Sequence, residues 1–402
     1  MAMSLVVHGA TLSGLAAGAR LAKLGHDVEL VTEGASLGGR WAATEGPGGH
    51  LVDALPQLVS LPATWRDVFK KSGGHLVTEL NRAGLALVEA PAVEHRFPDG
   101  STLELPAERG AQFHAISHRF GTPAAERWRD LIDDLDAVWA ARRAFGIDGP
   151  GLPLERTGRQ QLWLDRTLSG LGDRLDHPQL SVLVTDLGPM LGTHSPSAPA
   201  LLAATHAIDR TFGRWQLVDE DGRGQRASRL VELLADRVIE RGVSVVNHSA
   251  TPTSIDCRPR TTRSLLRPAP RRTLRPAISH ALRDDDGILA LRTTVEHTPT
   301  GPVTTWLRPV ADALMATTHD HRRGTPDPDW GLAPDSGRAW LRRTPIVGDL
   351  LAASACSPAG NEPWAELASA ALAVYELHER LTGEDCRPTN RHFRGSTLEQ
   401  RS

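Results

Sequence analysis

The first forty residues contain two apolar runs of strand length, separated by a stretch with helical periodicity. The run at residues 5–7 leads to Gly9 and is typical of a short buried parallel strand. From residue 12 to residue 24 the apolar positions recur at helical spacing, and Gly25 follows where a helix would end. A second run at residues 28–31 is followed closely by the acid Glu33. The pattern predicts a strand, a helix and a second strand, the βαβ unit of a doubly wound α/β fold.

Three later segments repeat these two patterns. Residues 123–145 place Trp128, Leu131, Ile132, Leu135, Val138 and Trp139 on one helix face, which we interpret as a core stripe. Leu230, Leu233, Leu234, Val238 and Ile239 form a second stripe, Gly242 ends that helix, and residues 243–246 read as a buried strand. Residues 350–355 read as a strand, followed by a Pro/Gly loop and a helix along Leu367, Ala371, Val374, Tyr375 and His378.

Composition excludes several classes of function. The chain has 402 residues and a formal net charge of -3, which argues against bulk electrostatic binding of nucleic acid or membrane. Arginine is its usual cation, so the Arg- and Pro-rich residues 258–276 read as an exposed linker rather than a nucleic-acid site. No apolar run is long enough for a spanning helix and no secretory leader is evident, so we expect a cytoplasmic protein, with transient membrane contact still open.

Metal and disulfide chemistry are not expected. Cys257, Cys356 and Cys386 have no paired spacing, which favours neither a disulfide framework nor zinc. His319, Asp320 and His321 could suggest a metal, but adjacent residues of an extended strand point to opposite faces. We therefore predict a polar loop there and no metal site, and we expect residues 288–310, which alternate, to form an antiparallel sheet.

The turn after the first strand reads Gly9-Ala10-Thr11-Leu12-Ser13-Gly14, with threonine where a dinucleotide-binding turn usually has its second glycine. A helix N-terminus at this place can face a pyrophosphate, and Glu33 can accept hydrogen bonds from a ribose. Two interpretations of Thr11 stay open. At positive φ the residue would be strained and would crowd the pyrophosphate. At negative φ it would cap the helix and spare the site.

Beyond this turn the sequence resembles the flavin-binding superfamily of phytoene desaturases, amine oxidases and protoporphyrinogen oxidases. The resemblance rests on Gly38-Gly39-Arg40 after the acid, on residues 48–74, on a hairpin at 95–106 and on the closing loop with Pro358, Gly360 and Pro363. It implies FAD as cofactor, with Arg40 at a phosphate or flavin edge and the last helix, beginning near Pro363 and Trp364, facing the flavin. Ser354 stands where the superfamily has an acid, Leu55 replaces a glycine, and about twenty residues are missing after residue 246 unless residues 255–257 supply a strand.

The resemblance implies a discontinuous Rossmann-like FAD/NAD(P)-binding domain with an inserted α+β substrate domain. Its segments would be 1–75, 214–260 and 340–385, with 76–213 and 261–339 as the substrate domain and 386–402 as a tail. The implied function is flavin-mediated dehydrogenation or isomerisation of a small apolar, polyene or isoprenoid, substrate. Two alternatives stay open: a divergent member that has lost FAD and binds a partner, and a binder of reduced nicotinamide. No catalytic residue can be named.

Overall fold

A five-stranded parallel sheet forms the centre of the first half of the molecule. The computed structural model describes residues 4–53, 58–149, 155–259, 275–279, 291–310, 313–322 and 332–388. The strand order is β11-β2-β1-β12-β17. The bounds are β1 Leu5–His8, β2 Val28–Val31, β11 Ser244–Val246, β12 Thr253–Asp256 and β17 Leu351–Ala352. Strands from three distant parts of the chain therefore build one doubly wound sheet, which confirms the predicted fold class.

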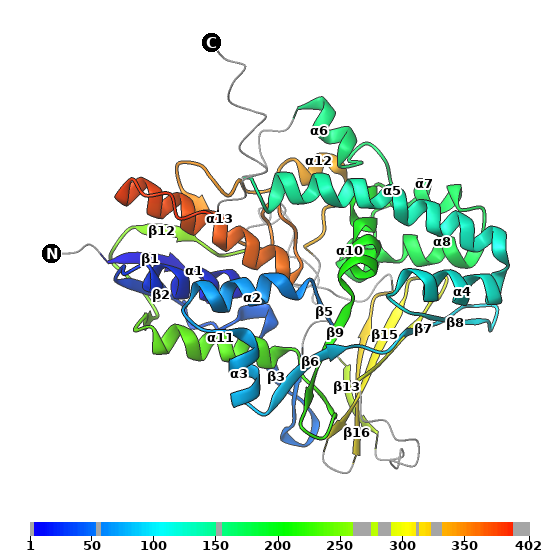
Figure 1. The fold of residues 1–402 in the computed structure, drawn as a ribbon, viewed down its shortest axis with the longest axis horizontal. Helices are drawn as coiled ribbons and strands as arrows, with labels where there is room; N and C mark the ends of the chain where they lie inside the picture. Colours follow the sequence, from blue (N-terminus) through cyan, green and yellow to red (C-terminus); the bar gives the residue numbers. More distant parts are fainter. Residues whose placement is uncertain are drawn as a thin grey trace.

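Three helices cover this sheet and bury its apolar side chains. Helix α1 (Leu12–Lys23) packs against α11 (Ser228–Glu240) and α13 (Pro363–Thr382), as Figure 1 shows. Helices α2 (Pro62–Lys71) and α3 (Leu76–Arg82) lie beside them. The core joins Leu15 of α1, Leu30 of β2, Leu234 of α11 and Val374 of α13. This packing holds the β1–α1 turn against the loop that precedes α13.

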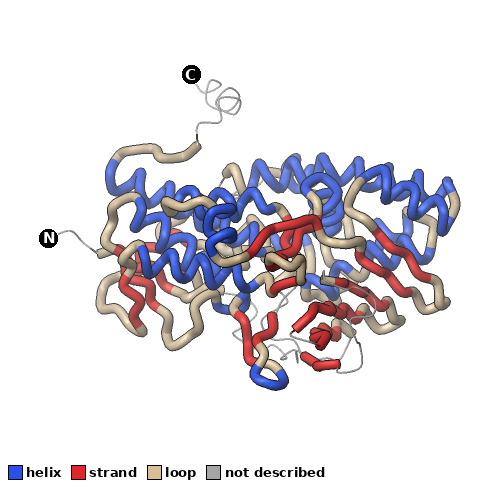
Figure 2. Tube along the Cα trace, turned by 60° about the horizontal axis from the view of Figure 1, so that its bottom comes forward, coloured by secondary structure: helices blue, strands red, loops and turns tan. Residues whose placement is uncertain are grey.

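A six-stranded sheet under a layer of helices forms the second half (Figure 2). Its order is β13-β16-β15-β14-β7-β8, antiparallel except where β14 runs parallel to β7. The strands are β7 Val93–Arg96, β8 Thr102–Leu105, β13 Arg275–Ser279, β14 Arg292–Glu296, β15 Val303–Val310 and β16 Ala313–Asp320. The helices are α4 Arg109–Phe120, α5 Thr122–Gly146, α6 Arg156–Gln161, α7 Leu168–Arg174, α8 Pro178–Thr185, α9 Leu187–Leu191, α10 Ala204–Phe212 and α12 Gly337–Trp340.

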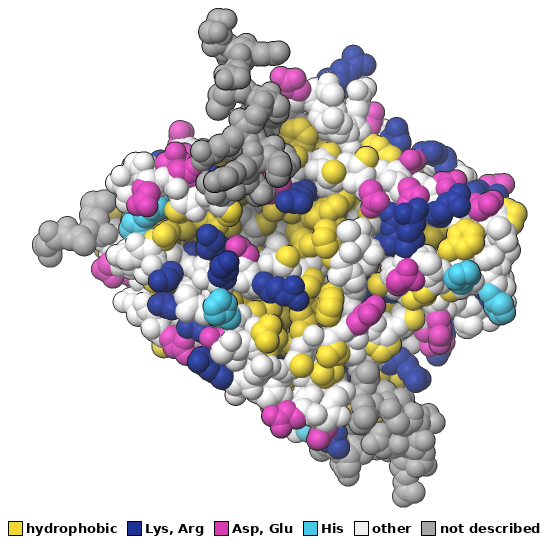
Figure 3. Space-filling model, viewed as in Figure 1, with side chains coloured by type: hydrophobic (Ala, Val, Ile, Leu, Met, Phe, Trp, Pro, Cys, Tyr) yellow, Lys and Arg dark blue, Asp and Glu magenta, His cyan; other side chains and the backbone are white. Residues whose placement is uncertain are grey.

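Short elements connect the two halves. A small sheet contains β5 Val59–Ser60, β6 Leu85–Glu89, β9 Arg214–Asp219 and β10 Gly224–Gln225, and a hairpin pairs β3 Ala43–Glu45 with β4 Leu51–Asp53. Three 3₁₀ turns are η1 Gly39–Trp41, η2 Pro47–Gly49 and η3 Ala200–Ala203. On the face shown in Figure 3, hydrophobic side chains lie across the middle and charges of both signs surround them. This mixture agrees with the small net charge.

Most of the pattern-based predictions hold. The predicted stripe of α5 is buried from Trp128 to Trp139, the hairpin at 95–106 is β7 paired with β8, and α11 ends just before Gly242. Strand β12 lies between β1 and β17. Residues 253–256 therefore form a strand in the region where the sequence is about twenty residues shorter than the superfamily pattern.

Three predictions are wrong, and the strand expected at 350–355 is limited to β17, Leu351–Ala352. Residues 243–246 were expected to be a buried strand, but β11 lies at the edge of the sheet and the side chain of Val245 is 42% exposed. Ile239 was placed in the α11 stripe and is 60% exposed, since it lies one position past the buried Val238. His319 and His321 are buried at the end of β16 rather than in a polar loop, because pairing with β15 extends the sheet through Asp320.

The domain boundaries stay a prediction. Leu76, Leu80 and Leu85, predicted for the substrate domain, pack into the core of the first half. Residues 260–274 of the predicted linker and the tail from residue 389 lie outside the described residues, as do Leu55 and Pro56. The three cysteines are free thiols. No helix among the described residues combines the length and apolar character needed to cross a bilayer.

Candidate functional site

The β1–α1 turn has the backbone of a dinucleotide-binding turn. Gly9 has φ +123°, a conformation that favours glycine. At Gly14 an added Cβ would lie 2.0 Å from the carbonyl oxygen of Gly9, so only glycine allows this approach of helix and strand. Both glycines therefore have the structural roles that the motif requires.

Thr11 is the N-cap of α1. Its φ is -78° and its hydroxyl accepts a hydrogen bond from the amide of Gly14 at 3.2 Å. The same hydroxyl donates to the carbonyl of Cys257 at 2.9 Å. The capping interpretation is confirmed and the strained one is wrong, because an extended N-cap residue needs no positive φ. Threonine in place of the second glycine is thus compatible with a regular N-terminus of α1.

Replacing Thr11 by alanine should lower the free energy of unfolding by about 1 kcal/mol, because the helix loses its cap. Serine should keep stability within a few tenths of that of the parent protein, since its hydroxyl can cap in the same way. Urea denaturation of the two variants measures the difference. An alanine variant as stable as the serine variant would contradict the capping role.

The neighbours of Thr11 tie the turn to two other loops. The amide of Gly38 donates to the carbonyl of Ala10 at 2.7 Å, and the Ser13 hydroxyl donates to the carbonyl of Ala353 at 2.8 Å. Leu12 is fully buried in the core, so only its backbone can serve a ligand. The turn, the Gly38 loop and the loop before α13 therefore meet at one place.

Glu33 lies next to this turn but already has partners. Its carboxylate is 2.8 Å from Nε2 of His8 and 3.3 Å from the guanidinium of Arg258. The hydrogen bond from His8, with the charge of Arg258, holds the pKa of Glu33 below its usual value. Arg258 also packs over Gly9, with its backbone nitrogen 3.0 Å from where a Cβ would be. The backbone of the turn fits a dinucleotide, and Arg258 occupies the space beside Gly9 and Glu33.

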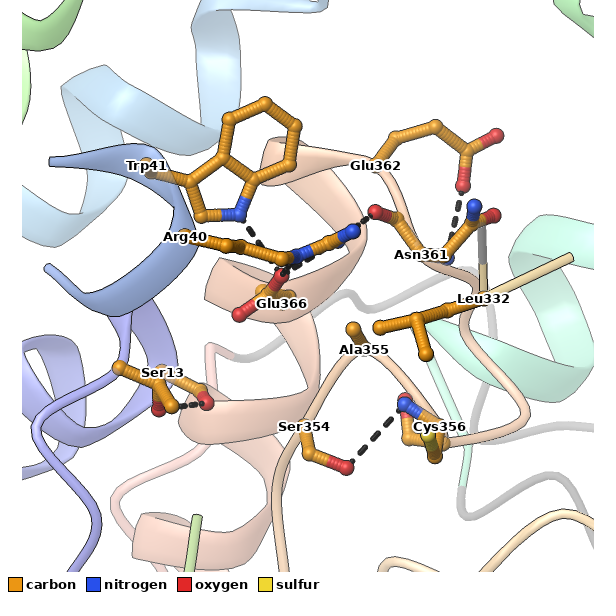
Figure 4. Close-up of polar contacts among 12 residues, drawn as sticks. Ser13, Arg40, Trp41, Leu332, Ser354, Ala355, Cys356, Asn361, Glu362 and Glu366 are labelled. Carbon is orange, nitrogen blue, oxygen red and sulfur yellow. Dashed lines mark hydrogen bonds and ion pairs between the residues drawn. The ribbon is translucent and has the colours of Figure 1, made fainter. Parts of the chain in front are cut away.

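Arg40 is part of a buried polar network at the start of α13. Its Nε and Nη2 donate to Oε1 of Glu366 at 3.1 and 2.7 Å, and Nη2 also donates to the carbonyl of Asn361. Nε1 of Trp41 donates to the same oxygen of Glu366 at 2.8 Å. Figure 4 shows these groups converging on Glu366. The side chain of Glu366 is 2% exposed. The predicted contact of Arg40 with a phosphate or the flavin edge stays a prediction. In this structure the carboxylate of Glu366 balances the charge of Arg40.

Two further arginines hold the loop that precedes α13. Arg142 of α5 binds the carboxylate of Glu362 at 3.0 and 2.7 Å and the carbonyl of Ala359. Arg343 donates to the carbonyls of Ala355 and Ser357, each at 2.9 Å. Burial would raise the pKa of Glu362, but the Arg142 guanidinium outweighs it and lowers the pKa. Burial lowers the pKa of Arg343 to about 10, so it stays charged at neutral pH.

The predicted residues of this loop lie at the same place. Ser354 is 4% exposed and its hydroxyl accepts a hydrogen bond from the amide of Cys356 at 3.1 Å (Figure 4). Gly360 has φ +135°, and a Cβ there would lie 2.0 Å from Arg142. Pro363 is the first residue of α13 and Trp364 is buried under the Arg142 guanidinium. Their contact with a cofactor stays a prediction.

A large cavity begins at this network and extends to the six-stranded sheet. It encloses about 1400 Å³ of empty space, its mouth included, and its surface is mainly apolar. Arg40, Trp41, Pro363 and Trp364 line one part. Leu183, Leu187, Met190, Ile208, Val295 and Trp306 line others, with His95, His206, His297, Asp209 and Arg214 among them. A long apolar molecule with a polar group would match this lining.

The histidine His206 in this cavity should make stability depend on pH. Burial lowers its pKa to about 4, although its contact with the Leu183 carbonyl opposes the shift. The unfolded chain therefore binds more protons than the folded one between about pH 6.5 and pH 4, and stability falls as pH falls through that window. Urea denaturation at pH 7 and pH 5 should show a smaller loss for His206→Asn than for the parent protein. The exposed His248→Asn is the control, and a loss in His206→Asn equal to the control's would contradict the prediction.

Sequence reasoning missed the partners of the predicted residues. Arg142, Arg343 and Glu366 belong to none of the motifs described above, and Arg258 is the first residue of the predicted linker. Only Glu366 carried a signal, since an acid in the first turn of a helix often interacts with the helix dipole. The rest came together through the fold alone.

Comparison with known proteins agrees with this geometry. Residues 7–72 match the model of an NAD(P)-binding Rossmann-like domain. The chain is 33% identical over 144 residues to a phytoene dehydrogenase of Streptomyces griseus, covering 36% of this chain and 27% of that protein. It is 29% identical over 210 residues to a hydroxyneurosporene desaturase of Rhodobacter capsulatus, covering 50% and 41%. The predicted sequence similarity to phytoene desaturases is confirmed over this part of the chain.

Solved structures show how far the shared fold extends. A putrescine oxidase bound to putrescine superposes with a TM-score of 0.59 at 14% identity, covering 95% of this chain and 100% of that one. Cyclohexylamine oxidase from Brevibacterium oxydans gives 0.58 at 14% identity, with coverage of 95% and 100%. At this identity the likeness concerns the fold alone. The matches to the two curated desaturases span only 27% and 41% of their lengths.

Proposed function

We propose that this protein is an FAD-dependent oxidoreductase that dehydrogenates or isomerises an apolar, polyene-like substrate. The observation that carries the proposal is the mainly apolar cavity, which opens against Arg40, Trp41 and the first residues of α13. In a Rossmann-like oxidoreductase this is where a substrate meets its cofactor. The desaturase relatives support a polyene as substrate class. A cytoplasmic location belongs to the same proposal.

The proposed FAD site combines three loops. The residues that would hold FAD are Gly9, Ala10, Thr11, Leu12, Ser13 and Gly14 at the pyrophosphate, Glu33 at the ribose, Gly38, Gly39 and Arg40 beside them, and Ser354, Gly360, Pro363 and Trp364 toward the flavin. When bound, FAD supplies the hydride acceptor. The chain's own residues would orient the substrate and exclude water, which is why a Ser/His/Asp site is not required. The loss of FAD is not favoured, because Thr11 caps its helix and β12 completes the sheet.

The test is the absorbance spectrum of the purified protein between about 300 and 550 nm, with the ligand released and identified. We expect two flavin bands and FAD. Glu33→Ala should weaken FAD binding about tenfold, because a charged acceptor of the ribose is lost. Glu45→Ala removes an exposed acid of β3 and should leave affinity unchanged. A featureless spectrum with no binding on titration would refute the proposal and turn the search to protein partners.

A further inference from the structure

A chain of three buried polar side chains ends in the cavity, on the six-stranded sheet. His95 lies on β7, and β14 runs parallel beside it with Val295 opposite His95. His297 follows β14 directly, and its amide donates to the carbonyl of Arg96 at 2.8 Å. Asp186 lies between α8 and α9. The parallel register thus brings His95 and His297, 202 positions apart in sequence, to one place.

The three side chains are linked in series. Oδ2 of Asp186 is 2.6 Å from Nδ1 of His297, and Nε2 of His297 is 3.0 Å from Nδ1 of His95. His95 is 7% exposed and His297 is 3% exposed. The ring of Phe97 stacks on His297 at 5.1 Å and 8°, which holds its orientation. Buried polar groups of this kind are costly unless each finds a partner.

The carboxylate fixes the direction of the first hydrogen bond in the series, and the neutral form of His297 fixes the second. Asp186 can only accept, so Nδ1 of His297 carries a proton and Nε2 of a neutral His297 is an acceptor. His95 must then donate from Nδ1, which leaves Nε2 of His95 with a lone pair. No hydrogen bond among the described residues engages that nitrogen, and His95 lines the cavity.

The surroundings keep His95 neutral. Burial lowers its pKa well below the usual value, and the neighbouring His297, Arg214 and His206 lower it further. These groups come from the strands and helices packed around the ring: His297 after β14, Arg214 on β9 and His206 on α10. A neutral His95 whose Nδ1 is already a donor can offer only an acceptor to the cavity.

We propose that Asp186, His297 and His95 form a specificity device that selects a substrate with a hydroxyl or other hydrogen-bond donor at one end of an otherwise apolar body. The inference deepens the proposed function by naming the substrate class. It concerns binding alone and needs no cofactor chemistry. An alcohol can donate to Nε2 of His95, whereas an aldehyde or ether presents only lone pairs to the same nitrogen and leaves it unpaired.

The experiment compares two polyene probes of one carbon skeleton, retinol as donor and retinal as acceptor, by equilibrium binding without turnover. We expect retinol to bind about tenfold more tightly than retinal, because retinol can form one buried hydrogen bond with His95 that retinal cannot form. His95→Phe should remove the preference and retain binding of both probes. In Asp186→Asn the amide can donate as well as accept, so His297 can reverse its hydrogen bonds and the preference for retinol should vanish or invert. This second variant keeps the test valid if His95→Phe folds poorly.

A matched control is another hydrogen-bonded histidine pair among the described residues, in which Nε2 of His26 lies 2.9 Å from Nδ1 of His378, away from the cavity lining. His26→Gln should keep the retinol preference. Equal affinity for the two probes, tighter binding of retinal, or no affinity for either would overturn the inference. Because binding is measured without turnover, these outcomes are separate from the presence or absence of FAD.

Discussion

Replacing Gly14 by alanine is expected to lower the free energy of unfolding by at least about 3 kcal/mol, or to prevent soluble expression. The added Cβ would lie 2.0 Å from the carbonyl oxygen of Gly9, a backbone atom that cannot turn aside. Relief requires α1 to move away from β1 and β2, and α1 is the helix on which both α11 and α13 pack. The damage should therefore spread through the core and abolish FAD binding as well. Urea denaturation and flavin content of the same preparation measure both effects.

The same helix provides the control. An added Cβ at Gly18 would be 3.7 Å from Val243, an ordinary contact distance. Gly18→Ala should be neutral or stabilise the protein by up to about 1 kcal/mol, because alanine has the higher helix propensity. If Gly14→Ala were as stable as Gly18→Ala, the close packing of α1 on β1 would not depend on glycine at position 14.

Removing the carboxylate of Glu366 is expected to cost about 3–5 kcal/mol of stability, because the guanidinium of Arg40, whose side chain is only 12% exposed, loses the negative charge that Glu366 supplies. Glu366 accepts from Nε and Nη2 of Arg40 and from Nε1 of Trp41, and its side chain is 2% exposed. This network joins the Gly38 loop to α13, so Glu366→Ala should also loosen the mouth of the cavity. Urea denaturation measures the loss of stability, and probe binding measures the change at the mouth.

Two comparisons test the cause. Glu376→Ala removes an acid of the same helix that pairs with Arg380 and Arg387 nearer the surface, and it should cost less than about 1 kcal/mol. The double variant Arg40→Met/Glu366→Leu should recover much of the loss, since an uncharged pair leaves no buried charge unpaired. A double variant as unstable as Glu366→Ala would show that packing rather than charge is decisive.

The elements of the cofactor domain could be predicted because their signals are local. Gly9, Gly14 and Gly25 mark the ends of β1 and α1 through backbone conformation and close approach, and apolar periodicity marks the buried faces. The errors at β11 and at Ile239 have one cause. Hydrophobicity reports that a residue can be buried, whereas position in the sheet decides whether a neighbour covers it.

The candidate site was predicted only in part. The turn from Gly9 to Gly14 and the loop before α13 come from motifs, and the fold brings them together. What Thr11 does depended on one dihedral angle, which the residue type alone leaves open. The partner of Arg40 could not be predicted, because Glu366 is more than three hundred residues away and charge pairing across such a separation follows from packing.

The sequence by itself therefore determined the βαβ unit, the helices that cover it and the superfamily that the chain resembles, since these depend on neighbours within a few turns or on contiguous motifs. Only the tertiary structure decided that Thr11 caps rather than strains α1, that Arg258 covers the glycine turn and that Glu366 neutralises Arg40. It also decided that His95, His297 and Asp186 share one hydrogen-bonded series. Directional bonds and ion pairs act over about 3 Å, so they exist only where the fold has already brought distant segments into contact.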